Sequence, residues 1–192
     1  MPTNRFNSSP GSTPEPARAV DAINAYVIGQ DGNRPHAISR AFTEDAELTI
    51  QGDAARIGLP LRVTGRSSIA KVLVTGFHNA WENVYTLCIG TQPPDNATAF
   101  SCDWMMAMSA KRDGTPMIGC GRYDWRFEPE SHRARSLAIR IDALEAPRCD
   151  ADVVTDWVAA LPYPWCARAK IIAAPPSVPG LLVIVERLKT SS

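Results

Sequence analysis

The sequence predicts an α+β fold in which three N-terminal helices close a strongly curved antiparallel sheet into a cone, with a C-terminal extension. Two observations lead to this prediction. Apolar residues recur at helical spacing up to about residue 80, and they alternate with a period of two from about residue 83 onward. The alternating runs exceed the usual five or six residues of a strand. Long strands joined by tight turns tend to curl, so helices can cover the hollow side.

The first helix follows a polar N-terminal segment. Residues 1–16 are rich in Asn, Ser, Thr, Pro and Gly and are expected to be disordered. Thr13-Pro14 provides a helix start, with Thr as the cap and Pro at the first helical position. Val20, Ile23 and Val27 fall at helical spacing and supply the buried face.

A shorter second helix and a third helix complete the N-terminal part. Between them, residues 47–51 alternate as a half-buried strand does. A loop punctuated by Gly and Pro spans residues 52–65. The third helix is indicated by Ile69, Leu73 and Phe77, which recur every four residues.

The sheet is predicted from the following long runs and their turns. Asp113-Gly114 marks the tip of a hairpin. The predicted strands span residues 83–91, 97–109, 116–127 and 135–144. With the helices, they form a domain over residues 17–145.

The composition changes after residue 145. The extension over residues 146–192 holds six of the sixteen prolines. Residues 150–160 predict a helix, and the apolar run Leu181–Val185, which is rich in β-branched residues, predicts an edge strand. We expect the extension to lie over the cone or across a dimer partner, and we expect a homodimer.

Composition excludes several classes of partner. Lys and Arg together equal Asp and Glu at 20 each, which argues against nucleic acid, because phosphate binding needs a clustered cationic surface. No apolar run approaches the length that spans a bilayer, and the N-terminus lacks the apolar core of a signal peptide, so we expect a cytoplasmic protein without a membrane partner. Five scattered cysteines and three distant histidines predict core thiols and no metal site.

Four segments resemble one known superfamily. They are Ala22–Gln30, Ala41–Ala46, Gly65–Ile69 and the strand Gly121–Phe127. The chain resembles the nuclear transport factor 2-like superfamily over residues 17–145, and within it the SnoaL-like polyketide cyclase and ketosteroid isomerase branch. The resemblance implies a cone with an apolar pocket. It implies no single reaction, because the superfamily holds isomerases, dehydratases, cyclases, epoxide hydrolases and non-enzymes.

The resemblance also implies roles for individual positions. Tyr26 matches the oxyanion-donating Tyr of the isomerases, and Tyr123 falls near their second donor. Ile50 stands where those isomerases carry their base. Asp103 roughly matches the acid of the epoxide hydrolase branch. That branch carries an Arg two residues before the acid, and this chain has Ser101 at that position. The known catalytic sets are therefore incomplete in this chain.

Asp103 is the foremost catalytic candidate by its surroundings. It interrupts an almost wholly apolar strand, and a desolvated carboxylate there can act as a general acid or base. The alternative is a structural carboxylate paired with an arginine or a backbone amide.

Alternation along one strand places Tyr123, Trp125 and Phe127 toward the cone interior, with a charge ladder on the other face. Tyr26 lies on the buried side of the first helix, and is either a pocket donor or a core residue. The candidate substrate-binding residues are Trp104, Met105, Trp125, Phe127, His78 and Phe42.

Two functions remain open from the sequence. The first is a cofactor-free lyase, isomerase or cyclase that acts on a small apolar substrate, with Asp103 moving the proton and Tyr26 or Tyr123 stabilising an oxyanion. The second is a non-catalytic binding or assembly module of the same fold, in which the pocket or the extension takes a ligand or partner without chemistry. The missing base at Ile50 and the missing Arg at Ser101 favour the second, whereas an acid buried in an apolar strand opposite tyrosines favours the first. We take the enzyme as the prediction and the binding module as its alternative.

Overall fold

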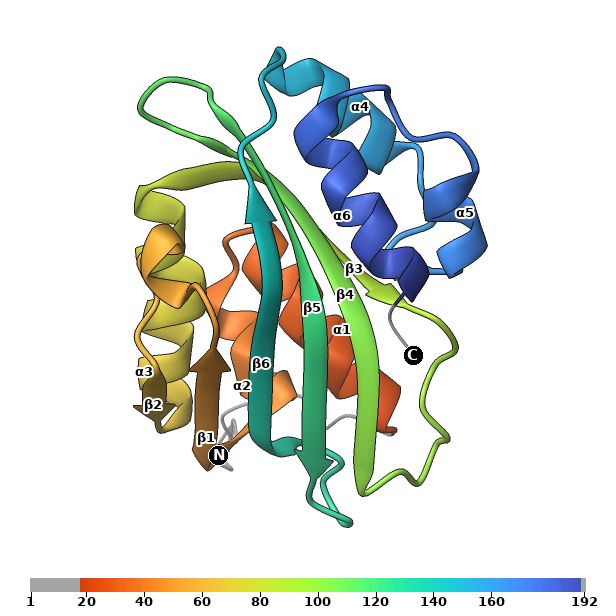
Figure 1. Cartoon of the computed structure of the whole chain (residues 1–192). Helices are drawn as coiled ribbons and strands as arrows, with labels where there is room; N and C mark the ends of the chain where they lie inside the picture. Colours follow the sequence, from red (N-terminus) through yellow and green to blue (C-terminus); the bar gives the residue numbers. More distant parts are fainter. Residues whose placement is uncertain (1–17, 191–192) are drawn as a thin grey trace, which may run out of the picture.

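The computed structural model describes residues 18–190, so the predicted segment 1–16 lies outside the described residues. Within this range, seven strands form one sheet in the order β2-β1-β6-β5-β4-β3-β7 (Figure 1). The strands are β1 (Phe42–Gln51), β2 (Arg62–Thr64), β3 (Trp81–Ile89), β4 (Ala99–Ala110), β5 (Pro116–Phe127), β6 (Ala134–Glu145) and β7 (Trp165–Cys166). The predicted α+β class is confirmed.

The sheet is mixed, which corrects the prediction of an antiparallel one. β1 pairs in parallel with β6, and β3 pairs in parallel with the short β7. The remaining pairs, including the long β3-β4-β5-β6 meander, are antiparallel. β1 lies between β2, which follows it along the chain and pairs with it in antiparallel, and β6, the last long strand, with which it runs in parallel. The sheet does not close into a barrel, and β2 and β7 form its two edges.

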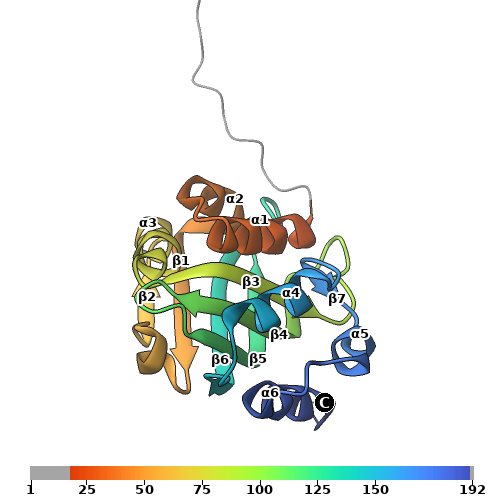
Figure 2. The same cartoon turned by 90° about the horizontal axis from the view of Figure 1, so that it is seen from above.

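Three helices from the N-terminal part precede or interrupt the strands. They are α1 (Ala19–Asp31), α2 (Ile38–Ala41) and α3 (Arg66–Ala70). A π-helical segment, Lys71–Gly76, continues α3, and a 3₁₀ turn, Ala54–Ile57, lies in the loop before β2. Figure 2 shows α1 and α2 on one side of the sheet, which we call the inner face. Their apolar residues and the inner side chains of the strands form one core cluster.

The C-terminal extension covers part of the opposite face, which we call the outer face. It contains α4 (Ala151–Ala159), α5 (Arg168–Ala173) and α6 (Pro179–Thr190). α4 contacts β3 and β4, while α6 contacts β5 and β6 (Figures 1 and 2). A second apolar core, separate from the inner one, joins these helices to the outer face.

The predicted edge strand over Leu181–Val185 is wrong, because this run is part of α6. Leu181, Ile184, Val185 and Leu188 are all buried, and their spacing is that of one helix face. The short run of β-branched residues hid a helical period that becomes visible only when Leu188 is included.

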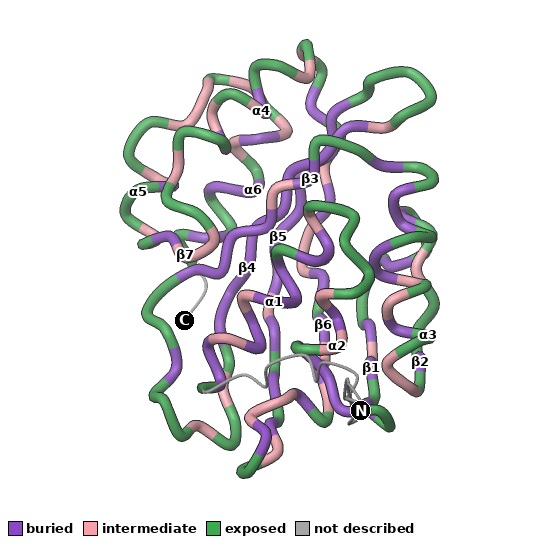
Figure 3. The backbone as a smooth tube through the Cα atoms, turned by 180° about the vertical axis from the view of Figure 1, so that it is seen from behind, coloured by how far each residue is buried: buried purple, intermediate pink, exposed green. Residues whose placement is uncertain are grey.

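The middle strands are therefore buried from both sides, as the tube in Figure 3 shows along β4 and β5. Along β4, Cys102, Trp104 and Met106 belong to the inner core, while Met105 and Ala107 belong to the outer one. This explains why β4 is almost continuously apolar rather than alternating. Among residues 18–190, no helix has the length and apolarity that a membrane crossing requires.

Candidate functional site

An apolar cavity lies between the inner face of the sheet and the helices that cover it. Side chains from α1, the 54–57 turn, the π-helical segment and strands β4, β5 and β6 form its wall. The space open to the centre of a water molecule is about 20 Å³, enough for about one water. Two glycines of β5 are needed for close packing here: a Cβ at Gly119 would lie 2.5 Å from the Leu144 side chain, and one at Gly121 would lie 3.0 Å from Trp104.

Two tyrosines form the phenolic part of this wall. Tyr26 comes from α1 and Tyr123 from β5, and their hydroxyl oxygens lie 3.4 Å apart. The two rings meet edge to face, at 5.8 Å between centroids. Burial raises the pKa of both phenols well above the ordinary value of 10. Both are therefore neutral at physiological pH and available as hydrogen-bond donors.

Two further polar groups in the wall have no partner. Gln30 of α1 is 1% exposed, and its side-chain oxygen Oε1 is buried without a hydrogen bond among the described residues. Trp104 of β4 is 3% exposed, and its indole Nε1 is likewise buried without a partner among them. The cavity therefore presents one unused acceptor and one unused donor, beside the two hydroxyls.

An aromatic cluster continues from the cavity wall into the core. Trp125 contacts Tyr26 at 5.4 Å and Phe42 at 5.9 Å between ring centroids. Phe127 stacks on Trp125 at 6.0 Å. Trp125, Phe42 and Phe127 were expected to bind substrate, but none of them lines the cavity. Phe42 and Trp125 pack against the ring of Tyr26, and Phe127 packs against Trp125.

His78 binds the end of α1 and does not line the cavity. Its Nε2 lies 2.5 Å from the backbone oxygen of Gln30. A carbonyl oxygen only accepts, so this imidazole nitrogen donates and fixes the end of α1 on the segment after α3. His78 is not part of the cavity wall.

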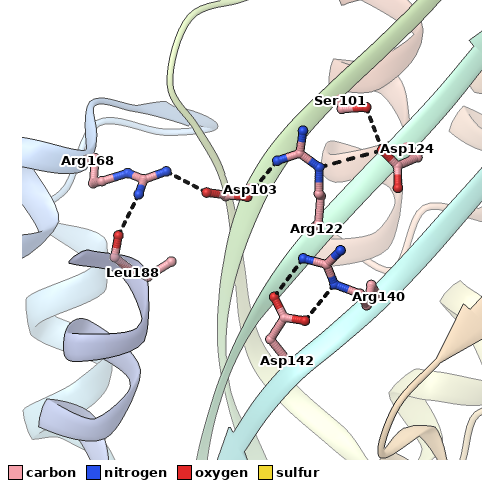
Figure 4. A network of polar contacts seen from close by, with 8 residues as sticks. All are labelled: Ser101, Asp103, Arg122, Asp124, Arg140, Asp142, Arg168 and Leu188. Carbon is pink, nitrogen blue, oxygen red and sulfur yellow. Dashed lines mark hydrogen bonds and ion pairs between the residues drawn. The ribbon is translucent and has the colours of Figure 1, made fainter. Parts of the chain in front are cut away.

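Asp103 lies on the outer face of the sheet, away from the two tyrosines on the inner face. Its carboxylate sits between two guanidinium groups, 3.3 Å from Arg122 of β5 and 2.5 Å from Arg168 of α5 (Figure 4). Arg168 also donates to the backbone oxygen of Leu188 in α6, at 2.7 Å. The carboxylate is 6% exposed and ties the extension to the sheet.

The expected catalytic group of Asp103 with Tyr26 and Tyr123 is therefore not assembled. In the β4-β5 ladder, Asp103 stands opposite Arg122 and Cys102 stands opposite Tyr123, so Asp103 and Tyr123 belong to opposite faces. Met105 points to the outer core for the same reason. Of the predicted site residues, the cavity brings together Tyr26, Tyr123 and Trp104.

The sequence reasoning missed Gln30 as a site residue. A helical signal for it exists, because Gln30 follows Ile23 and Tyr26 by seven and four residues and so shares their face. A polar residue on an otherwise apolar helix face is the pattern that would have found it.

A second carboxyl, which is half-buried, lies at the end of α1, outside the cavity wall. Asp31 accepts hydrogen bonds from the backbone and hydroxyl of Thr86, each at 2.7 Å, and from the hydroxyl of Tyr163 at 3.1 Å. Burial raises its pKa from 3.8 to about 7, although these hydrogen bonds favour the ionised form. Residues 18–190 contain no group of three or more His, Cys, Asp or Glu that could hold a metal ion.

No protein-family model and no curated protein matches the chain. Solved structures do resemble it. A proposed isomerase from Rhodopseudomonas palustris is 10% identical at a TM-score of 0.54, over 64% of this chain and 87% of that one. A proposed isomerase from Bacillus subtilis is 9% identical at 0.52, over 65% and 86%. A nuclear transport factor 2-like superfamily protein from Salmonella enterica is 17% identical at 0.49, over 62% and 84%.

At such identities the likeness is one of fold and does not extend to chemistry. The likeness agrees with the observed architecture, in which N-terminal helices cover one face of a sheet of long strands. Over about two thirds of its length, the chain has the fold of the Rhodopseudomonas palustris and Bacillus subtilis structures.

Proposed function

We propose that this chain binds a small, largely apolar molecule in the inner cavity through uncharged hydrogen-bonding groups. The observation that carries the proposal is the pair of buried, unpartnered atoms in the cavity wall, Gln30 Oε1 and Trp104 Nε1. Leaving a buried polar atom unpaired costs about 1–3 kcal/mol. A ligand that supplies the missing partners recovers this free energy on binding.

Binding is favoured over acid–base catalysis by what the cavity wall contains. The described residues of the wall include no carboxylate, imidazole or amine, and its only titratable groups are the phenols of Tyr26 and Tyr123. A general base must reach its proton within hydrogen-bond distance. Asp103 would have to leave both arginines and cross the sheet to do so.

A cofactor-free isomerase or cyclase is the second candidate, and the tyrosine pair is what favours it. Two neutral hydroxyls 3.4 Å apart can donate to one developing oxyanion. Such an enzyme would use Tyr26 and Tyr123 for electrophilic catalysis, with the proton taken up by the substrate itself or by water.

Cyclohexanone provides a test of the proposed function, because it combines an apolar ring with one acceptor. On titration, the indole N–H signal of Trp104, assigned with the Trp104→Phe variant, is expected to shift in a ¹⁵N-correlated NMR spectrum. Methylenecyclohexane, which has the same shape without the oxygen, should bind more weakly. A Trp104 signal that stays in place up to the solubility limit of cyclohexanone would reject ligand binding in this cavity.

The same ketone separates the two candidates. An enzyme that stabilises the enolate accelerates exchange of the α-hydrogens of cyclohexanone with D₂O, and Tyr26→Phe or Tyr123→Phe should abolish this acceleration. Tyr85→Phe is a matched control, because Tyr85 packs against the outer core. If the Trp104 signal shifts but the α-hydrogens of cyclohexanone exchange no faster than in buffer, the function is binding.

A further inference from the structure

The inner cavity must widen before it takes a ligand larger than water, and a larger space adjoins it. The cavity admits the centre of a water molecule over only about 20 Å³. A groove on the surface between the 54–57 turn and the π-helical segment offers about 480 Å³ by the same measure. Ligand sites in proteins are typically of this larger size. The cavity can therefore hold one end of a molecule whose remainder occupies the groove.

The two spaces share part of their walls. Ile57, Leu59 and Phe77 line both the cavity and the groove. Ile57 and Phe77 are buried, at 8% and 3% exposed, while Leu59 is half-buried. Ile57 and Leu59 belong to the segment between β1 and β2 rather than to the sheet. A head group larger than water can enter when these loop side chains change rotamer, without disturbing the strands.

Polarity is distributed unequally along this path. The unpartnered oxygen of Gln30 and the unpartnered indole nitrogen of Trp104 lie in the wall of the inner cavity. Most of the groove wall is apolar or glycine, and its polar members, Ser68 and Lys71, come from the α3 and π-helical segments. A matching ligand carries a donor and an acceptor at its inner end and hydrocarbon along the rest.

The inner end of the ligand must be uncharged. No charged side chain is among the described residues of the cavity wall. A carboxylate or ammonium there would lose its hydration without gaining a counter-charge, which is far more costly than burying a neutral amide or hydroxyl.

We infer that the ligand is an elongated amphiphile, with a neutral donor–acceptor head group bound by Gln30 and Trp104 and an apolar tail in the groove lined by Ile57, Leu59 and Phe77. This inference rests on the proposed function and adds the shape and head-group chemistry of the ligand.

Straight-chain amides test it directly. Octanamide should shift the Trp104 indole signal and raise the melting temperature of the full chain. Affinity should increase about fourfold for each methylene between butanamide and octanamide, which is the gain for burying one methylene. Octanoate, with a charged head, and decane, without one, should bind at least tenfold more weakly than octanamide.

Two variants separate the head site from the tail site. Gln30→Leu should lower octanamide affinity about tenfold while leaving the gain per methylene unchanged. Ala80→Trp, at an exposed position of the groove wall that does not line the cavity, should fill part of the groove and reduce the gain per methylene while leaving butanamide binding intact. Gln51→Leu and Leu61→Trp are matched controls, because both positions are exposed and neither lines the cavity or the groove.

The outcomes distinguish this inference from the proposed function. Equal affinity for butanamide and octanamide, or for octanamide and octanoate, overturns the elongated amphiphile while a shifted Trp104 signal still supports cavity binding. An Ala80→Trp variant that keeps the full dependence on chain length also overturns it. No shift with cyclohexanone or with any amide overturns both proposals.

Discussion

Replacing Asp103 by Asn should destabilise the fold and leave the inner cavity unaffected. The substitution removes the negative charge that holds two guanidinium groups, 3.3 Å and 2.5 Å from the carboxylate. Removing one partner of a fully buried ion pair costs about 3–5 kcal/mol, and an exposed pair is worth at most about 1 kcal/mol. The carboxylate is 6% exposed, but both arginine side chains are 32% exposed. The expected loss therefore lies between the two limits, at about 2–3 kcal/mol.

Urea unfolding and calorimetry measure this loss. For a chain of this size, about 2–3 kcal/mol corresponds to a fall in melting temperature of about 4–12 °C. Asp124→Asn is the matched control, because Asp124 lies on the same outer face with a side chain 52% exposed, and it should cost less than about 1 kcal/mol. An unchanged melting temperature of Asp103→Asn, combined with lost binding or turnover in the cavity, would refute the structural role and make Asp103 a site residue.

Three further predictions concern buried groups. The pKa of Asp31 rises from 3.8 to about 7 on folding, so stability should fall as pH rises from about 4 to about 7 and be level above. At about 1.4 kcal/mol per pKa unit, the shift corresponds to a loss of about 4 kcal/mol in the free energy of unfolding. Solvent screening of this half-buried residue reduces the expected loss to roughly half of that value. Asp31→Asn should remove the slope of stability with pH in urea melts across this range. Gln30→Leu should raise the melting temperature of the unliganded chain, because it removes an unpaired buried oxygen. The free energy of unfolding should increase by up to about 1–3 kcal/mol. Gly121→Ala should cost about 3 kcal/mol in urea melts, at the upper end of the usual range for overpacking, because its Cβ would collide with the backbone oxygen of Arg140.

Each of these has a control. Asp45→Asn, at an exposed carboxyl, should keep the wild-type slope with pH, and an equal slope in Asp31→Asn would contradict the assignment. Gln51→Leu, also exposed, should leave stability within about 0.5 kcal/mol. Gly119→Ala should cost less than Gly121→Ala, because the nearest atom to its Cβ would be the flexible end of Leu144, and the nearest backbone oxygen, of Ala143, would lie 3.1 Å away.

The strands were predictable because their signals are local. β5 spans Pro116–Phe127, as predicted, since a turn bounds it at each end. The Asp113-Gly114 tip was also predictable: Gly114 adopts a φ of 72°, which favours glycine. The parallel pairing of β1 with β6 was not predictable, because no local pattern records which distant strand becomes a neighbour.

The candidate site was only half predictable for a related reason. Alternation separates Trp104 from Asp103 and Met105, but it does not say which set faces the cavity. β4 is covered on both faces, so both sets are apolar enough to appear internal. The two arginines that hold Asp103 come from other elements, and one of them, Arg168, lies 65 residues away, so no local pattern marked this carboxylate as structural.

The parallel pairing of β1 with β6 also affects the order of folding. Leu48 finds its partner Leu137 only across the whole β2–β5 region, so the loop that closes this contact is among the longest in the chain. Loop-closure entropy must be overcome before such a contact contributes free energy, and chains dominated by distant contacts fold slowly. During synthesis, α1, α2 and β1 emerge before β6 is available, and their apolar inner surfaces stay uncovered in that interval. We therefore expect the docking of β6 beside β1 to be the late step that completes the cavity, and the nascent chain to be most prone to aggregation before it.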